Sequence, residues 1–230
     1  EGLGLAVAAE VPLVVIDVMR GGPSTGIPTK SEQTDLNAAI YGLHGEAPHL
    51  VLAPTSIADA LFTTQWAVHL AESMQTPAIV LSDQALGQTT AIINPPANVQ
   101  FLAERAVMRC PQPDYARYAI TADGVSPVTL PGTPGGQYTA DGLEHGPRGT
   151  PSSRGEDHAL QLDKRVHKIA SFNYGVHWAD VEGDGPVAVI TWGSTTGAVR
   201  EAVRRLRDAG HAVRVIAMRL LAPPQEEQLA

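Results

Sequence analysis

Continuous apolar runs mark several segments of the chain as strands. Val11–Val18 is rich in β-branched residues, which is typical of a strand buried on both faces of a sheet. Leu50–Ala53 and Pro77–Leu81 have the same character, so the same burial is expected of them. Two further strands are predicted near the end of the chain, over Pro186–Thr191 and Ala212–Met218.

Helical spacing of apolar residues separates these runs. It predicts helices over Asp35–Leu43, Ile57–Met74, His158–Ser171 and Gly197–Ala209. The first residues, Glu1–Glu10, favour another helix that runs into the first strand. Strands and helices that alternate at this spacing predict a parallel α/β sheet.

Two of these helices have a predicted buried stripe. In Ile57–Met74 the stripe consists of Leu61, Val68 and Ala71, and Thr55 or Ser56 is available as the N-cap. In His158–Ser171 it consists of Leu162, Val166 and Ile169.

Residues 84–160 differ in composition from the rest of the chain. Their clusters of proline and glycine favour loops and turns over regular elements. The segment is too long for an ordinary connection, so we expect it to pack on something, such as a neighbouring subunit. The turn Glu182–Gly185 suggests a boundary between a first domain, 1–183, and the start of a second, 184–230.

Composition excludes several classes of protein. The chain has 230 residues, 43% of them hydrophobic, and no apolar run approaches the ~18 residues that a membrane span needs. Its formal net charge of -8 argues against a global nucleic-acid footprint. A single cysteine, Cys110, excludes an intrachain disulfide framework and a four-thiolate iron–sulfur site within this chain. Charged residues make up only 17%, below the ~25% of typical domains, which suggests that part of the surface is covered.

The cations are unevenly distributed. Residues 1–100 contain nine acidic residues but only two basic ones, Arg20 and Lys30. Both lie in the segment Met19–Lys30, which follows the first predicted strand and which we call the Arg20 loop. Ligands of open α/β sheets bind beyond the carboxyl ends of strands, so this position favours a binding site.

The Arg20 loop contains residue types suited to an anion. Arg20 offers a planar fork for a carboxylate or phosphate, and Lys30 adds a second positive charge. Ser24, Thr25 and Thr29 supply hydroxyl groups. Glycines allow close backbone approach, and prolines stiffen the loop. The alternative is a tight turn with a surface arginine.

The loop also matches a hydrolase motif. Gly22–Gly26 has the G-x-S-x-G spacing of a nucleophile elbow, with Ser24 as the nucleophile. That motif needs a helix starting at the serine, and Pro28 would clash within its first turns. The context therefore argues against a hydrolase.

Two other motifs are weaker. Thr191–Gly197 is a strand–loop–helix junction whose amides could hold an anion, although a turn that caps a helix is the simpler interpretation. The four histidines between residues 145 and 177 have no metal-binding spacing, so no metal ligand is predicted.

The sequence R-G-G-P-S-T-G-x-P-T-K at Arg20–Lys30, after an apolar strand, resembles the α subunit of the 2-oxoacid:ferredoxin oxidoreductases, the 2-oxoglutarate synthase type in particular. Shorter motifs continue the resemblance along essentially the whole chain. Each is weak alone, and they support the resemblance because they occur in the same order as in the family. They are Gln33-x-Asp35-Leu36, His44-Gly45-Glu46-x-Pro48, Leu81-Ser82-Asp83-Gln84, Gly142-x-Glu144-His145, Lys164-Arg165-x-x-Lys168 and Gly193-Ser194-Thr195 with Glu201-Ala202.

The resemblance implies a fold and an activity. The fold would be a thiamine-diphosphate-enzyme pyrimidine-type domain, truncated at its N-terminus, followed by the start of a transketolase-C-terminal-like domain. The enzymes use thiamine diphosphate to decarboxylate a 2-oxoacid oxidatively, passing the acyl group to coenzyme A and electrons to ferredoxin. A partner β subunit would hold Mg²⁺, the diphosphate and the iron–sulfur cluster, and the complex would be cytoplasmic.

The resemblance also implies residue roles. Arg20 and Thr29 match the family residues that recognise the 2-oxoacid, with Ser24, Thr25 and Lys30 as weaker candidates. The activating glutamate of the family would precede Glu1, so no catalytic residue is assigned and the fragment alone is expected to be inactive. Two alternatives stay open, another thiamine enzyme of the transketolase or dehydrogenase type and a non-catalytic interaction subunit.

Overall fold

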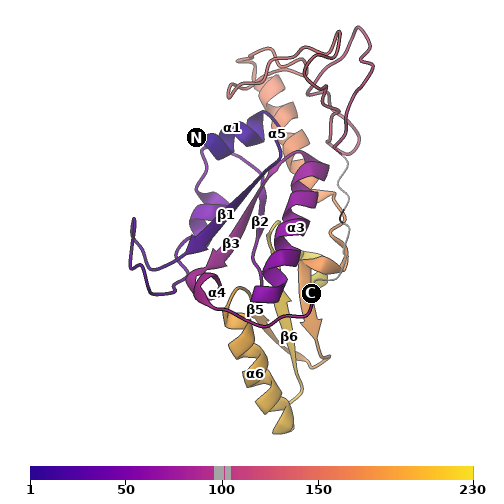
Figure 1. Cartoon of the computed structure of the whole chain (residues 1–230). Helices are drawn as coiled ribbons and strands as arrows, with labels where there is room; N and C mark the ends of the chain where they lie inside the picture. Colours follow the sequence, from indigo (N-terminus) through magenta and orange to yellow (C-terminus); the bar gives the residue numbers. More distant parts are fainter. Residues whose placement is uncertain (96–100, 102–104, 230) are drawn as a thin grey trace.

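The computed structural model of this chain describes residues 1–95, 101 and 105–229. It contains two sheets, with α3 and α5 beside the first and α6 beside the second (Figure 1). The first sheet is formed by three strands from the first half of the chain and one from its end, and the second by strands from the last quarter.

The first sheet has four strands in the order β1-β3-β2-β7. β1 (Leu13–Met19), β3 (Pro77–Asp83) and β2 (Leu50–Leu52) are mutually parallel, which confirms the predicted parallel α/β arrangement. β7 (Leu220–Ala222) adds an antiparallel pairing to β2. This short strand was not predicted from the sequence.

The prediction that β1 is buried on both faces is wrong. β1 forms an edge of the sheet, where Leu13, Ile16 and Val18 are 40%, 57% and 49% exposed. β3 lies in the interior of the same sheet, and all its residues except Ser82 are buried, as expected. An apolar run alone does not indicate whether a strand has neighbours on both sides.

α3 (Ile57–Met74) matches the predicted helix residue for residue. Ser56 caps it, since its hydroxyl accepts the amide of Asp59 at 3.1 Å. The predicted stripe was only partly right, because Leu61 and Val68 are exposed while Ala71 is buried. The face that packs on the sheet is shifted around the helix axis and comprises Thr63, Trp66, Ala67, Leu70, Ala71 and Met74.

Alternating strand residues divide the first core into two layers. Leu50, Leu52 and Val80 pack with α3, on the face that Trp66 fills. On the other face the core contains Val51, Ile79 and Leu81. They pack with α1 (Gly2–Ala8) through Leu3 and with α2 (Leu36–Tyr41) through Leu36, Ala39 and Ile40. Helices on both faces of a mostly parallel sheet define an α/β architecture. No helix of the described residues is both long and apolar enough to cross a membrane.

The Pro/Gly-rich segment is irregular, as predicted. After α4 (Gln84–Gln88), the described residues up to 154 form turns and isolated bridges, with no further helix or strand. In Figure 1 the later loops of this segment, between the grey trace and α5, lie at the top, above α1 and beside the start of α5. Arg117, Tyr118 and Ser126 of this segment are buried against other parts of the same chain. Part of this Pro/Gly-rich segment, which we also call the excursion, therefore packs on the chain itself.

α5 (Gly155–Ala170) corrects a second predicted stripe. Ile169 is buried, but Val166 is exposed. The buried face consists instead largely of polar and cationic residues, namely Gln161, Lys164, Arg165, Lys168 and Ile169. The spacing of apolar residues could not predict this face, because the burial of its lysines depends on a carboxylate from a distant part of the chain.

That carboxylate belongs to Glu10, whose side chain is fully buried. Its oxygens lie 2.6 Å from Lys164 Nζ, 3.3 Å from Lys168 Nζ and 3.9 Å from Arg117 Nη1. We call these four residues the Glu10 cluster. It joins the turn between α1 and β1 to α5 and to the Pro/Gly-rich segment.

The second sheet has the order β4-β6-β5. β5 (Val187–Thr191) and β6 (Val213–Met218) are parallel and joined through α6 (Thr195–Asp208), which confirms the predicted strand–helix–strand unit. β4 (Ala179–Glu182) follows the short 3₁₀ helix η1 (Gly175–Trp178) and pairs antiparallel with β6. The last described helix is α7 (Glu226–Leu229).

The boundary predicted near residue 183 falls between two strands of this second sheet, and we keep the division into 1–183 and 184–230 as a proposal. Ion pairs also connect α3, which packs on the first sheet, with the second sheet. Arg219, between β6 and β7, pairs with Asp59 of α3 at 2.8 Å and with Asp180 of β4 at 2.9 Å.

Candidate functional site

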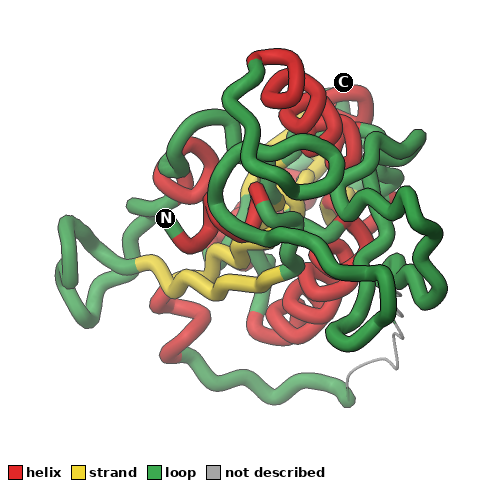
Figure 2. Tube along the Cα trace, turned by 90° about the horizontal axis from the view of Figure 1, so that it is seen from above, coloured by secondary structure: helices red, strands yellow, loops and turns green. Residues whose placement is uncertain are grey.

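The Arg20 loop begins where β1 ends and projects beyond the sheet. It is the indigo loop to the left of β1 in Figure 1, and Figure 2 shows it extending past the strands from a second direction. This position agrees with the rule that ligands of open α/β sheets bind beyond the carboxyl ends of strands.

Backbone hydrogen bonds close the loop on itself. Gly21 N donates to the Lys30 carbonyl at 3.0 Å, and Ile27 N donates to the Gly21 carbonyl at 2.7 Å. Gly26 has a φ of 63°, and a Cβ there would lie 1.6 Å from the Gly21 carbonyl oxygen. Only glycine fits this close approach, so the conformation of the loop requires a glycine at position 26.

Two side chains outside the loop hold its arms. Thr34 Oγ1 donates to the Arg20 carbonyl at 3.0 Å. Gln84, the first residue of α4, donates through Nε2 to the Pro28 carbonyl. Both partners come from sequence positions that no local pattern connects to the loop.

A cavity of about 490 Å³ lies against this loop. Arg20 and Ser24 line it, together with three acidic residues, Asp17, Glu32 and Asp35. Burial, with Asp35 nearby, raises the pKa of the Asp17 carboxyl above its usual value. Among the described residues no carboxylate lies within ion-pairing distance of the Arg20 guanidinium, which remains available to an anion.

The predicted site residues are thus only partly brought together. Arg20 and Ser24 share the cavity, whereas Thr25, Thr29 and Lys30 are exposed and are not among its lining residues. Thr29 follows Pro28, whose carbonyl is held by Gln84. The roles of these five residues stay predictions.

Sequence reasoning missed the acidic lining of the cavity. Asp17 interrupts the apolar run of β1, and this interruption was the available sign that one side of the strand faces a polar space. Glu32 and Asp35 come from the segment between the loop and α2, where nothing in the spacing marks them.

The hydrolase interpretation lacks its structural context. A nucleophile elbow needs a helix directly after the serine, but no helix begins between Ser24 and α2 at Leu36. Ser24 itself lies in a tight turn with a φ of 59°.

The Thr191–Gly197 junction is a helix-capping turn that already holds an anion. The Ser194 amide at the start of α6 donates to Asp83 Oδ2 at 3.1 Å. Asp83 stands at the end of β3, so its carboxylate links the first sheet to the second. Both flank a cavity of about 310 Å³, which Met19, Glu32 and Trp192 also line.

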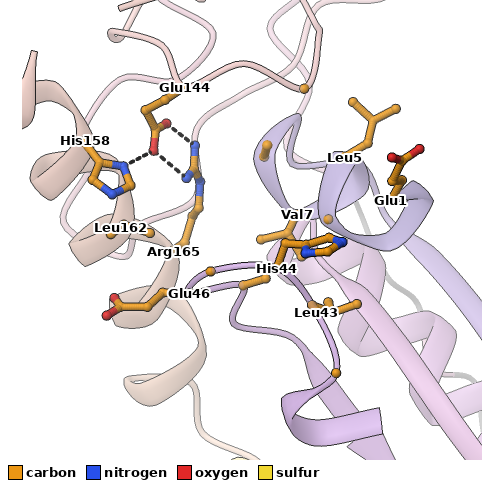
Figure 3. Close-up of a pocket in the computed structure, with 16 residues that line it drawn as sticks. Glu1, Leu5, Val7, Leu43, His44, Glu46, Glu144, His158, Leu162 and Arg165 are labelled. Carbon is orange, nitrogen blue, oxygen red and sulfur yellow. Dashed lines mark hydrogen bonds and ion pairs between the residues drawn. The ribbon is translucent and has the colours of Figure 1, made fainter. Parts of the chain in front are cut away.

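Another cavity, of about 530 Å³, lies away from the Arg20 loop between α1, the 42–47 turn and α5. Figure 3 shows His158 and Arg165 of α5 pointing at Glu144, with His44 on the opposite wall. Glu144 is satisfied by Arg165 at 2.8 Å and His158 at 2.6 Å, which hold its pKa below the usual range despite burial. The Arg165 guanidinium in this cavity is therefore paired within the chain, in contrast to that of Arg20.

The histidines do not converge on a metal site. Across the described residues no group of three or more His, Cys, Asp or Glu side chains is placed to hold a metal ion. His145 bonds the carbonyls of Ala8 and Gly146, and His158 bonds Glu144.

A comparison with protein families matches residues 1–164 to the model of the pyruvate flavodoxin/ferredoxin oxidoreductase, thiamine-diphosphate-binding domain. This match covers more than half of the chain, which therefore belongs to that family. The match confirms that the α/β fold is of the thiamine-diphosphate-enzyme kind that the resemblance implies.

Individual relatives narrow the class further. The chain is 40% identical over 97% of its length to the 2-oxoglutarate oxidoreductase subunit KorA of Mycobacterium tuberculosis, covering 35% of that protein. It is 35% identical over 97% of its length to the 2-oxoacid:ferredoxin oxidoreductase subunit alpha of Saccharolobus solfataricus, covering 36%. The chain thus spans little more than a third of the length of these curated relatives.

A solved structure shares the fold of the whole chain. It is the 2-oxoglutarate:ferredoxin oxidoreductase from Magnetococcus marinus with 2-oxoglutarate, coenzyme A and succinyl-CoA bound. It matches with a TM-score of 0.89 and 40% identity, over all of this chain and 41% of the solved one.

Proposed function

We propose that this chain is part of the α subunit of a 2-oxoacid:ferredoxin oxidoreductase, with 2-oxoglutarate as the favoured substrate. The reaction would combine the 2-oxoacid with coenzyme A, release carbon dioxide, and pass two electrons to ferredoxin. The observation that carries this proposal is the Arg20 guanidinium, which pairs with no carboxylate among the described residues. It lies in a loop beyond the parallel strands of a thiamine-diphosphate-binding family. Named relatives that act on 2-oxoglutarate support the choice of substrate.

Thiamine diphosphate would supply the carbanion chemistry, while the protein supplies orientation and electrostatics. The described residues offer no cluster of ligands for Mg²⁺, and the only cysteine, Cys110, is exposed and unpaired. From the resemblance, we propose that a β subunit holds Mg²⁺, the diphosphate and the iron–sulfur cluster, and that the complex is cytoplasmic. This chain would provide the surface that receives the 2-oxoacid.

Arg20 suits the α-carboxylate of the substrate, because a guanidinium can donate two parallel hydrogen bonds to it. The Thr29 hydroxyl would donate to the keto oxygen as negative charge develops there. The nearby acids Asp17, Glu32 and Asp35 disfavour a second anionic group in the same cavity. The distal carboxylate of 2-oxoglutarate would then need a cation outside it, and Lys30 is the candidate within the loop.

The test is Arg20→Ala in the full-length enzyme assembled with its β subunit. We expect KM for 2-oxoglutarate to rise roughly 10- to 100-fold, since hydrogen bonds to charged groups contribute about 1.5–3 kcal/mol. KM for ferredoxin should stay unchanged, and Arg20→Lys should recover only part of the loss because its geometry is not bidentate. Arg154→Ala, at an exposed arginine paired with Glu156, is the matched control.

Two outcomes would redirect the assignment. Unchanged turnover and KM after replacement of both Arg20 and Thr29 would favour a non-catalytic interaction subunit. Dye reduction by the complex that needs no coenzyme A would favour another thiamine enzyme of the dehydrogenase type.

A further inference from the structure

Asp83 and Gln84 stand side by side where β3 ends and α4 begins. Asp83 is 8% exposed and uses both carboxylate oxygens. Oδ1 accepts the Leu86 amide at 3.0 Å and so caps α4, while Oδ2 accepts the Ser194 amide at 3.1 Å at the start of α6. This carboxylate therefore fixes α4 relative to the second sheet, and with it the position of Gln84.

Gln84 is 7% exposed, and its amide makes one hydrogen bond within the described residues. Nε2 donates to the Pro28 carbonyl of the Arg20 loop, whereas Oε1 is buried without a partner there. A buried polar group that is only half satisfied costs free energy, and an apolar side chain of the same size would avoid that cost. Packing of α4 alone does not account for a glutamine here, but the bond to the loop does.

The loop transmits this contact from one arm to the other. The Gln84 bond holds Pro28, and the Lys30 carbonyl two residues later accepts the Gly21 amide at 3.0 Å. Gly21 directly follows Arg20. Displacement of the Pro28–Lys30 arm therefore moves the backbone that carries the guanidinium, as well as the Thr29 hydroxyl.

From this geometry we propose that Gln84 is a positioning residue for 2-oxoacid binding. Its amide sets the separation of the Arg20 and Thr29 side chains by holding the Pro28 carbonyl, and Asp83 fastens it to α6. This inference rests on the proposed function, because it names what positions the substrate-binding loop.

The experiment compares Gln84→Met and Gln84→Glu in the full-length enzyme assembled with its β subunit. Methionine keeps the side-chain length and removes the donor, so KM for 2-oxoglutarate should rise roughly three- to tenfold, as for loss of one neutral hydrogen bond. KM for coenzyme A should stay within about twofold of the wild-type value, because the substitution removes no hydrogen bond to that substrate. A general loss of folding would instead lower activity without separating the two substrates.

Gln84→Glu adds a readout that packing alone would not produce. Ionised, the new carboxylate repels the Pro28 carbonyl, but protonated it can donate to it. Burial favours the protonated form, so the KM defect of this variant should shrink as the pH falls from about 8 to about 6. The defect of Gln84→Met, expressed relative to wild type at each pH, should not change.

Gln161 provides a matched control. It is also buried, its Nε2 donates to a backbone carbonyl, that of Tyr118 at 3.1 Å, and its Oε1 is also without a partner among the described residues. It lies in α5, away from the Arg20 loop. Gln161→Met should therefore alter thermal stability by an amount similar to Gln84→Met and leave KM for 2-oxoglutarate unchanged.

The possible failures are distinguishable. An unchanged KM in Gln84→Met, alongside a raised KM in Arg20→Ala, would overturn the positioning role and leave the proposed function standing. An unchanged KM in both would overturn the substrate site itself. Equal KM defects in Gln84→Met and Gln161→Met would show a general structural effect and would also overturn the inference.

Discussion

The cavity at the Arg20 loop and the Glu10 cluster both combine cations with carboxyl groups, but they differ in burial and in pairing. In the Glu10 cluster one carboxylate lies within 3.9 Å of three cationic groups, and its side chain is fully buried. In the Arg20 loop one guanidinium shares a solvent-accessible cavity with three carboxyl groups, and none of them pairs with it in the described structure.

This difference separates cations that hold the fold together from a cation that is free to bind. The three cations of the Glu10 cluster pair with the buried Glu10 carboxylate, which follows α1. These ion pairs connect the end of α1 with α5 and the excursion, so the charges of Lys164, Lys168 and Arg117 are used within the fold. Arg20 has its backbone fixed by Thr34 and the loop while its charged group remains accessible. A charge kept available on a fixed backbone is what recognition of an anionic substrate requires.

The largest effect is expected from Glu10→Gln. Removing one partner of a buried ionic group leaves the other charges uncompensated, which costs about 3–5 kcal/mol. Here three cations would lose their shared carboxylate, so we expect a loss at the upper end of that range. The free energy of unfolding, measured by urea denaturation of the full-length protein, checks this.

Glu156→Gln is the control for that substitution. Glu156 pairs with Arg154 at the surface, where both side chains are 70% exposed, and such pairs contribute about 0–1 kcal/mol. If Glu10→Gln costs no more than Glu156→Gln, the Glu10 cluster does not stabilise the fold and the contrast with the Arg20 loop fails.

A smaller effect is expected from pH. Burial lowers the pKa of Lys168 from its usual value of 10.5 to about 8, with the nearby Glu10 carboxylate partly opposing the shift. Between these values the unfolded chain binds more protons than the folded one, so the free energy of unfolding should rise with pH, by roughly 1–3 kcal/mol. Urea denaturation between about pH 8 and about pH 9.5 measures this rise, before the tyrosines of the unfolded chain ionise near pH 10 and act in the opposite direction.

The matched variant is Lys168→Met, which removes the titrating group. Its stability should be flatter over the same pH window than that of the wild type. The same slope in both proteins would mean that Lys168 does not titrate there, and that its charge in the Glu10 cluster persists at higher pH.

The strands show what local pattern can predict. Val11–Val18 and Pro77–Leu81 are both apolar runs, and both form strands, β1 and β3. Only β3 is buried on both faces, since β1 lies at the edge of the sheet. Strand order depends on the fold of the whole chain, and no property of the run itself encodes it. The short strands β4 and β7 were missed because their pairing partners, not their composition, define them.

The same limit applied to the site. The Arg20 loop was found from its composition and from its position after a strand, both of which are local. The Gln84 contact with Pro28 spans 56 residues, and the Lys164 contact with Glu10 spans 154. Contacts at such separations come from folding, so the motifs around Gln84 and Lys164 could be noticed in the sequence but not given a role.

The most direct test of the central claim is protection of Arg20 from chemical modification by the 2-oxoacid. The assembled full-length enzyme is treated with phenylglyoxal, which reacts with accessible guanidinium groups, and the modified arginines are quantified by mass spectrometry. We predict that 2-oxoglutarate slows modification of Arg20 at least about fivefold, as expected for a charged hydrogen bond, and leaves exposed Arg154 unaffected. Modification of Arg20 at the same rate with and without saturating 2-oxoglutarate would contradict the account.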